Sequence, residues 1–317
     1  MSISGISTLA QSQLLLSHIQ QDESALQQTQ SQVATGLVST TYGGIGDKTA
    51  ALESAQSQGA LADTYASTAQ LASNQVNLQD TQLSQLSTLA GQLQQDITTA
   101  VANSNGATLM TQAQSIFDQV VQILNAQDAN GNYIYGGGKA NTPPVTATTL
   151  AQLTALPSAA QAFVNGTQKA AVQVGNNQTV HVGVLASDVG TNLLQTLQDI
   201  ANFNNGPSGT FGQQLTSAQT GFLSGEILTA QTATQTVNNA AGANGEIYQE
   251  LQAAISQQQS FSTLYQGFAS DIKDADMATA SSNLSLNQSA LQAALEVTAQ
   301  LGRLSLLNYL GTSPTTG

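Results

Sequence analysis

Several residue groups have types and spacing that could support chemistry, and the first resembles a phosphate-binding loop. Residues 43–49 read Gly-Gly-Ile-Gly-Asp-Lys-Thr. A phosphate-binding loop of this kind needs a glycine directly before the lysine and a strand before the loop. Asp47 stands in the glycine position, and no strand pattern precedes the segment. The sequence therefore predicts a connection between helices and not a nucleotide site.

The remaining groups also lack a complete set of catalytic or metal-binding residues. Asp271, Asp274 and Asp276 are clustered, but a calcium loop needs more oxygen ligands at defined spacing, so we expect Asp274 to cap the following helix. His18 and His181 each stand alone and are expected to be surface residues. The chain has no cysteine and no Gly-x-Ser-x-Gly sequence. We predict no catalytic, cofactor-binding or metal-binding residues and no enzymatic activity.

The charge balance excludes two classes of partner. Five Lys and Arg against 18 Asp and Glu give a net charge of −13, and charged residues make up only 7% of the 317 residues. A nucleic-acid binder needs a basic stripe, and an anionic membrane would repel this chain. Such low charge, with many small and amide side chains, favours packing against copies of the same chain.

Targeting signals of the usual kinds are not expected. A secretory signal begins with a basic region, whereas the first basic residue here is Lys48. No stretch approaches the 18 apolar residues of a membrane-spanning helix. A cytoplasmic protein and a protein exported by a dedicated machine would both look like this.

Apolar residues at alternating steps of four and three predict long helices that pack side by side. The longest such seam comprises Tyr65, Ala69, Ala72, Val76, Gln79, Leu83, Leu86, Ala90, Leu93, Ile97 and Ala100. Shorter seams comprise Leu109, Ala113, Ile116, Val120 and Ile123, and then Ile247, Leu251, Ala254, Gln258, Phe261, Tyr265, Phe268, Ile272 and Ala275. A weaker N-terminal seam comprises Leu16, Ile19, Glu23, Leu26, Gln30, Val33 and Leu37.

The middle of the chain has a different pattern. Two alternating runs, 171–174 and 179–184, flank a Gly-Asn-Asn-Gln turn and predict a β-hairpin. The predicted fold class is therefore mainly α: an elongated antiparallel helical bundle or coiled-coil rod, formed by the N- and C-terminal halves, with a small inserted β-containing domain. We expect terminal segments at 1–45 and 277–317, a helical rod at 46–135 and 205–276, and the β-containing domain at 136–204.

Both ends of the chain resemble bacterial flagellins. The run from Asp276-Met277-Ala278 to Leu304-Ser305-Leu306-Leu307-Asn308-Tyr309-Leu310 resembles the flagellin C-terminus. Gln32–Leu37 resembles the region after the first flagellin helix, with Thr35 in place of the usual serine. Tyr133–Lys139 with Thr142-Pro143-Pro144 is more similar to the family's flagellin-like subunits at the junction of hook and filament than to filament flagellin.

This resemblance implies a structural subunit of the bacterial flagellum that joins hook to filament. It implies export through the flagellar type III apparatus without a cleavable signal peptide, and an extracellular location at the hook–filament junction. The implied partners are copies of the chain, a hook-associated protein on the hook side, flagellin on the filament side and an export chaperone at the C-terminal segment. A filament-forming flagellin, or a secreted surface adhesin acting through the middle domain, remains an alternative.

The apolar faces of the terminal segments are too diluted to be stable alone, so we expect them to become ordered on assembly. An ordinary intramolecular core is the alternative, because a heptad seam does not specify whose helix it faces. The residues predicted to form the assembly interface are Leu14, Leu15, Leu16, Ile19, Leu26, Val33, Leu284, Leu291, Leu295, Leu301, Leu304, Leu307 and Leu310.

Overall fold

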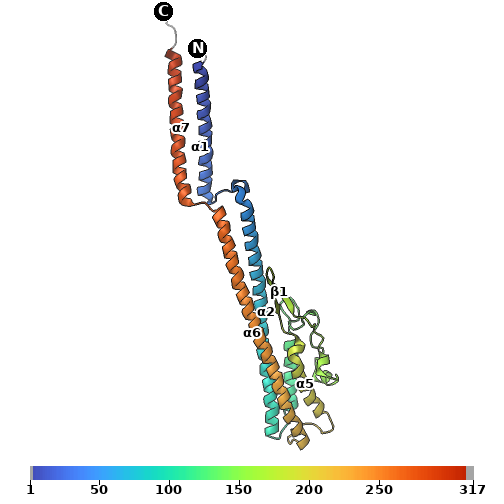
Figure 1. The fold of residues 1–317 in the computed structure, drawn as a ribbon. Coiled ribbons are helices and arrows are strands. Elements are labelled where there is room, and N and C mark those ends of the chain that lie inside the picture. The colour runs from blue at the N-terminus through green and yellow to red at the C-terminus, as the bar shows by residue number, and fades with distance from the viewer. Residues whose placement is uncertain (1–2, 312–317) are drawn as a thin grey trace, which may run out of the picture. The chain divides into compact units, whose positions relative to one another are not determined.

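The computed structural model describes the backbone of residues 3–311, and the side chains of residue 10 and of residues 13–303. Seven α-helices, three short 3-10 turns and one two-stranded sheet account for most of this part of the chain (Figure 1). The elements are α1 (Ile3–Thr35), η1 (Tyr42–Gly44), η2 (Gly46–Lys48), α2 (Thr49–Ala102), α3 (Leu109–Leu124), α4 (Leu150–Thr154), η3 (Ala159–Ala162), β1 (Ala170–Gly175), β2 (Gln178–Val182), α5 (Ala186–Asn204), α6 (Ser217–Lys273) and α7 (Met277–Gly311).

The chain divides into two compact units. Unit 1 comprises residues 1–60 and 262–317, and unit 2 comprises residues 61–261. The predicted fold class, mainly helical with a small β insertion between long packed helices, is confirmed. The finer domain boundaries proposed from the sequence stay a prediction.

Unit 2 is a helical bundle whose core lies between α2, α3, α5 and α6. In the long α2 seam every predicted position from Ala69 to Ala100 is buried, and Tyr65 is half-buried. The prediction that these positions face the core is confirmed, because steps of four and three keep one stripe of a helix facing its neighbours. Leu83, Leu93 and Ile97 have no exposed surface.

The β-hairpin covers the part of this bundle where α2 and α6 form a second, smaller cluster. β1 and β2 are antiparallel, with Val172 opposite Val180, which confirms the predicted hairpin. Val174, Val180 and Val182 are buried together with small residues of α2 and with Leu251 and Ile255 of α6. The valines of the hairpin thus cover apolar residues of α2 and α6 in this cluster.

The α6 seam departs from the prediction beyond Gln258. Phe261 and Phe268 are exposed, with 40% and 48% of their surface accessible. Ser262 is buried instead, and Ala269 is half-buried. The helix keeps the spacing but turns its smaller side chains inward, since small residues allow a closer approach of the neighbouring backbone. Reading the largest apolar residues as the inward ones was therefore wrong at these two positions.

Candidate assembly surface

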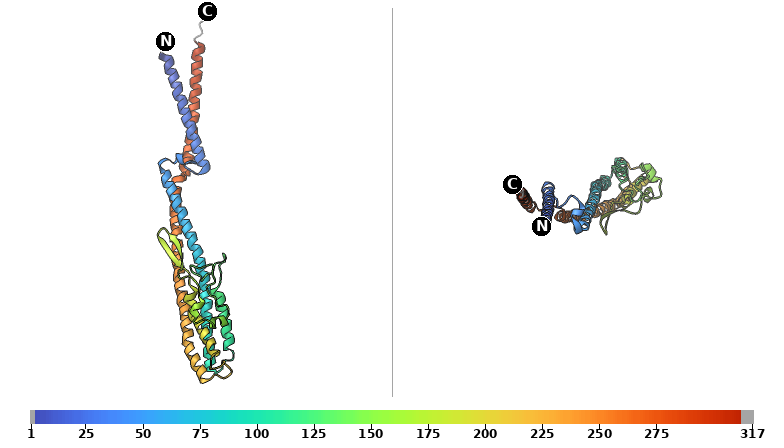
Figure 2. Two further views of the ribbon diagram at one scale, coloured as in Figure 1. Left: turned by 90° about the vertical axis from the view of Figure 1, so that its right-hand side faces the viewer. Right: turned by 90° about the horizontal axis from the view of Figure 1, so that it is seen from above.

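The two terminal helices of the chain pack against each other within unit 1. α1 and α7 pack against each other and run in opposite directions, so the start of α1 and the end of α7 lie at the same end of the pair (Figures 1 and 2). Their other ends are joined through the backbone. The amide of Val38 donates to the carbonyl of Lys273, and the amide of Ala275 donates to that of Gly36, both at 2.8 Å. Gly36 has a φ of +71°, a left-handed conformation that glycine adopts at little cost.

Asp276, and not Asp274, caps the N-terminus of α7. Its Oδ1 accepts hydrogen bonds from the amides of Ala278 at 2.9 Å and Thr279 at 3.3 Å. The hydroxyl and the amide of Thr279, followed by the amide of Ala278, hold the pKa of the Asp276 carboxyl below its usual range. Asp274 instead accepts a hydrogen bond from the Ser270 hydroxyl. The predicted cap was wrong by two residues, because the backbone pairing of Gly36 with Ala275 delays the start of the helix.

The contact between α1 and α7 includes polar side chains. Asn287 donates to the carbonyl oxygen of Ala25 at 3.3 Å and to the Thr29 hydroxyl at 3.4 Å. Thr29 is only 7% exposed. Its own hydroxyl donates within α1, to Ala25 or Leu26 at 3.0 Å. Because these polar groups are paired, they can occupy the packed face without a large desolvation cost.

The predicted register of the α1 seam is therefore wrong by one residue at three positions. Leu16, Glu23 and Gln30 are exposed, whereas the preceding residues Leu15, Asp22 and Thr29 are half-buried or buried. The run Leu14-Leu15-Leu16 offers three possible registers, and the apolar pattern alone does not decide among them. Polar Asp22 and Thr29 on the packed face are the reason that the pattern misled.

The predicted interface residues fall into three groups. Six are half-buried: Leu15, Ile19, Leu26, Val33, Leu284 and Leu291. Four are exposed: Leu14 at 63%, Leu16 at 58%, Leu295 at 51% and Leu301 at 42%. The side chains of Leu304, Leu307 and Leu310 lie outside the described residues.

Three further large apolar residues of α7 are exposed, and none of them was among the predicted interface residues. Met277, Leu286 and Val297 are 44%, 66% and 47% exposed. Among the described side chains of α1 and α7, only Thr29 and Ala280 are buried. The helix pair thus leaves several large apolar side chains exposed, and exposed apolar groups of this kind are found at interaction sites.

The other groups weighed from the sequence form no reactive site in the described part of the chain. The Gly-rich segment 43–49 folds into the two short 3-10 turns, and Asp47 and Lys48 are exposed. His18 and His181 are exposed, as predicted. No three His, Asp or Glu side chains gather where they could hold a metal ion among these residues. Within the described helices, none has a segment apolar enough and long enough to cross a membrane.

Helix α7, which carries part of this surface, lies almost entirely within a segment that matches a known protein family. Residues 227–310 match the bacterial flagellin C-terminal helical region, which here runs from within α6 to the end of α7. The chain has a flagellin-type C-terminal region. The resemblance of the C-terminal end to flagellins, inferred from the sequence, is thereby confirmed.

Proteins similar to this chain include hook-associated proteins. It is 35% identical over 92 residues to "Flagellar hook-associated protein 3" of Salmonella typhimurium, a match that spans 28% of this chain and 27% of the Salmonella protein. Its fold is similar to that of a Vibrio parahaemolyticus protein described as a flagellar hook-associated protein, with a TM-score of 0.56, 15% identity and coverage of 71% of this chain and 97% of that one. Bacillus cereus FlgL gives a TM-score of 0.48 at 12% identity, over 71% of this chain and 98% of that one.

Proposed function

We propose that this chain is a structural subunit of the bacterial flagellum that joins hook to filament. The observation that carries the proposal is the coincidence of two features on α7. The flagellin C-terminal match ends on this helix, and the same helix leaves Leu286, Leu295, Val297 and Leu301 exposed. A structural role, in place of an enzymatic one, agrees with the hook-associated relatives.

The physical driving force for assembly would be burial of these side chains by neighbouring copies. Fully burying a leucine contributes about 1.5–3 kcal/mol. Leu14, Leu16, Leu295 and Leu301 are each about half exposed, so covering them would contribute roughly 3–6 kcal/mol per subunit before the cost of association. The charged residues of α1 and α7 other than His18 are Asp22, Glu23, Glu296 and Arg303, so neighbouring copies would repel one another little.

The proposal extends to partners and location. The chain would contact copies of itself, a hook-associated protein on the hook side and flagellin on the filament side. Before export, a chaperone would cover its C-terminal segment. Export would use the flagellar type III apparatus without a cleavable signal peptide and deliver the subunit to the extracellular junction. Helical assembly implies head-to-tail contacts that do not close on themselves.

A filament-forming flagellin is the second candidate, since the matched C-terminal region is named for flagellins. Electron microscopy of the purified full-length chain under salting-out conditions separates the two roles. The junction role predicts no filaments from the chain alone, but binding to the ends of hooks that already carry the hook-associated protein of the hook side. Long filaments of this chain alone would contradict the junction role.

A further inference from the structure

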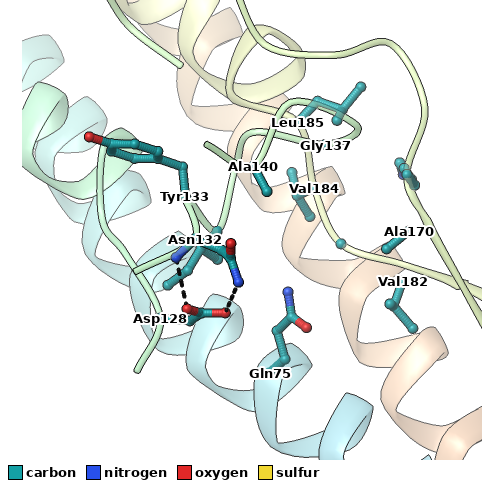
Figure 3. Close-up of a pocket in the computed structure, with 13 residues that line it drawn as sticks. Gln75, Asp128, Asn132, Tyr133, Gly137, Ala140, Ala170, Val182, Val184 and Leu185 are labelled. Atoms are coloured by element: carbon teal, nitrogen blue, oxygen red, sulfur yellow. Dashed lines mark hydrogen bonds between the residues drawn. The ribbon is translucent and has the colours of Figure 1, made fainter. Parts of the chain in front are cut away.

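A cavity of about 260 Å³ lies in unit 2, beside the region where the hairpin meets α2. Figure 3 shows Asp128 and Asn132 on one side of it and Val182 and Val184 on the other, with the Gln75 amide of α2 between them. Lys169 also lines it. The cavity therefore has a polar wall, with one carboxylate and two primary amides, facing an apolar wall of aliphatic side chains.

The polar wall is fixed in place by the local fold. Asp128 Oδ1 accepts hydrogen bonds from the amides of Asn130 at 2.8 Å and Asn132 at 2.9 Å. The amide of Asn132, with weaker contributions from neighbouring donors, lowers the pKa of the Asp128 carboxyl, so the group is ionised at neutral pH. Its Oδ2 has only a long contact of 3.4 Å, from the Asn132 amide. This oxygen can therefore still accept a strong hydrogen bond from a ligand.

The apolar wall is equally constrained. Val182 and Val184 are almost fully buried. Gly137, which also lines the cavity, has a φ of +57°, and a Cβ at this position would lie 2.5 Å from Leu185 Cδ2. Behind the cavity, Gln79 of α2 donates to the carbonyl of Ile134 at 3.2 Å and holds the loop to the helix. Such a preformed cavity lowers the entropic cost of binding a ligand.

The chemistry of the walls selects the class of ligand. A purely apolar ligand would desolvate the amides and carboxylate without replacing their hydrogen bonds, at about 1–3 kcal/mol for each group. Asp128 would repel an anion and Lys169 would repel a cation. Because the lining carries one charge of each sign, it favours a neutral ligand. A neutral ring with several hydroxyl groups satisfies both walls, because its hydroxyls bond to Asp128, Asn132 and Gln75 while its C–H face packs on the more accessible side chains of Ala140 and Ala170, next to the buried valines.

Size limits the ligand to one ring. Sites for drug-sized molecules enclose about 300–1,000 Å³, and this cavity is smaller. Among the described residues the Gln75 side chain has no hydrogen-bond partner within the protein, so its amide can bind a hydroxyl without breaking an existing contact. We propose that this cavity binds a single uncharged pyranose unit of a carbohydrate.

The test uses the full-length chain with isotope-labelled Val and Leu methyl groups. Methyl glucopyranoside, methyl mannopyranoside and N-acetylglucosamine are titrated separately to about 100 mM, a range that detects millimolar binding. We expect at least one sugar to shift the Val182 and Val184 methyl signals. Gln75→Ala and Asp128→Asn should each weaken that binding at least about fivefold, while Gln85→Ala, an exposed position elsewhere on α2, should not change it.

The two cavity variants are chosen so that a folding defect does not obscure the result. Gln75 forms no hydrogen bond within the described part of the protein, and asparagine at position 128 keeps an oxygen that can accept hydrogen bonds from the amides of Asn130 and Asn132. Their circular dichroism and melting temperatures should match those of the parent chain. Sugars that shift no methyl signals would overturn the proposal, as would binding that both variants leave unchanged. Shifts caused by free glycine or leucine but by no sugar would also overturn it.

Discussion

The side-chain amide of Gln258 in α6 donates a hydrogen bond to the main-chain carbonyl of Val174 in β1, at 3.0 Å, and both residues are buried. Gln79 of α2 makes the equivalent contact to the carbonyl of Ile134. These two glutamines are the polar interruptions of two otherwise mostly apolar seams. Each lies where the inserted region rests on the long helices, so the interruptions hold the insertion in place and do not weaken the bundle.

Replacing Gln258 should therefore destabilise the chain through Val174. Gln258→Met keeps the length of the side chain but removes the donor, which leaves the buried Val174 carbonyl without its partner. We expect a loss of about 1–3 kcal/mol in the free energy of unfolding, measured with urea. Gln257→Met, at the exposed neighbouring position, is the matched control and should change stability by less than about 0.5 kcal/mol. Equal effects of the two substitutions would contradict this role of Gln258.

The pH dependence of stability should be governed in part by Glu226 of α6. Burial, and then the negative charge of Asp199 in α5, raise the pKa of Glu226 from 4.5 to about 7. Because the folded-state pKa is the higher one, this contribution to stability is fully present below pH 4.5 and is lost as the pH rises through about 7. The carboxyl is only half-buried, so the loss should be roughly 1–2 kcal/mol.

Glu226→Gln tests this dependence directly. The variant should be more stable than the parent chain at about pH 8 and should show a flatter stability profile between about pH 4.5 and pH 8. Urea unfolding at several pH values provides the measurement. Glu250→Gln, an exposed acid on the same helix, should leave the profile unchanged. A Glu226→Gln profile that parallels that of the parent chain would show that Glu226 is not the responsible group.

The start of α7 offers a third prediction, since Asp276 caps the helix and Asp274 does not. Asp276→Ala leaves the amides of Ala278 and Thr279 without their acceptor and should lower the melting temperature and the helical signal. Asp274→Ala removes only the bond from Ser270 and should have a smaller effect. The reverse order of the two melting temperatures would favour the cap predicted from the sequence.

How much the sequence could predict depends on how local the signal was. The α2 seam and the hairpin were predictable because spacing within one segment determines which side chains face inward. The register of α1 was not, since Thr29 faces α7, where its hydrogen-bond partner Asn287 lies 258 positions away in the sequence. The cavity was also missed, because it combines single residues from α2, the loop at 128–140 and the strand end at 182–185. No spacing rule joins such residues before the chain is folded.

Assembly provides the last prediction, because the terminal helix pair contains both inward and outward leucines. Leu295→Asp changes a side chain that is 51% exposed, so the subunit should keep its helical content and melting temperature. Burying the new carboxylate against a neighbouring copy is unfavourable, and incorporation into flagella should fall at least about tenfold. Gln292→Asp, which adds the same charge at an exposed polar position of α7, should reduce incorporation far less. Immunogold labelling and motility of complemented cells would measure both.

Since Leu291, one turn away, is half-buried on the helix that packs on α1, Leu291→Asp should instead lower the melting temperature of the isolated subunit. Normal incorporation of Leu295→Asp would mean that the outward face of α7 is not the one that neighbouring subunits cover.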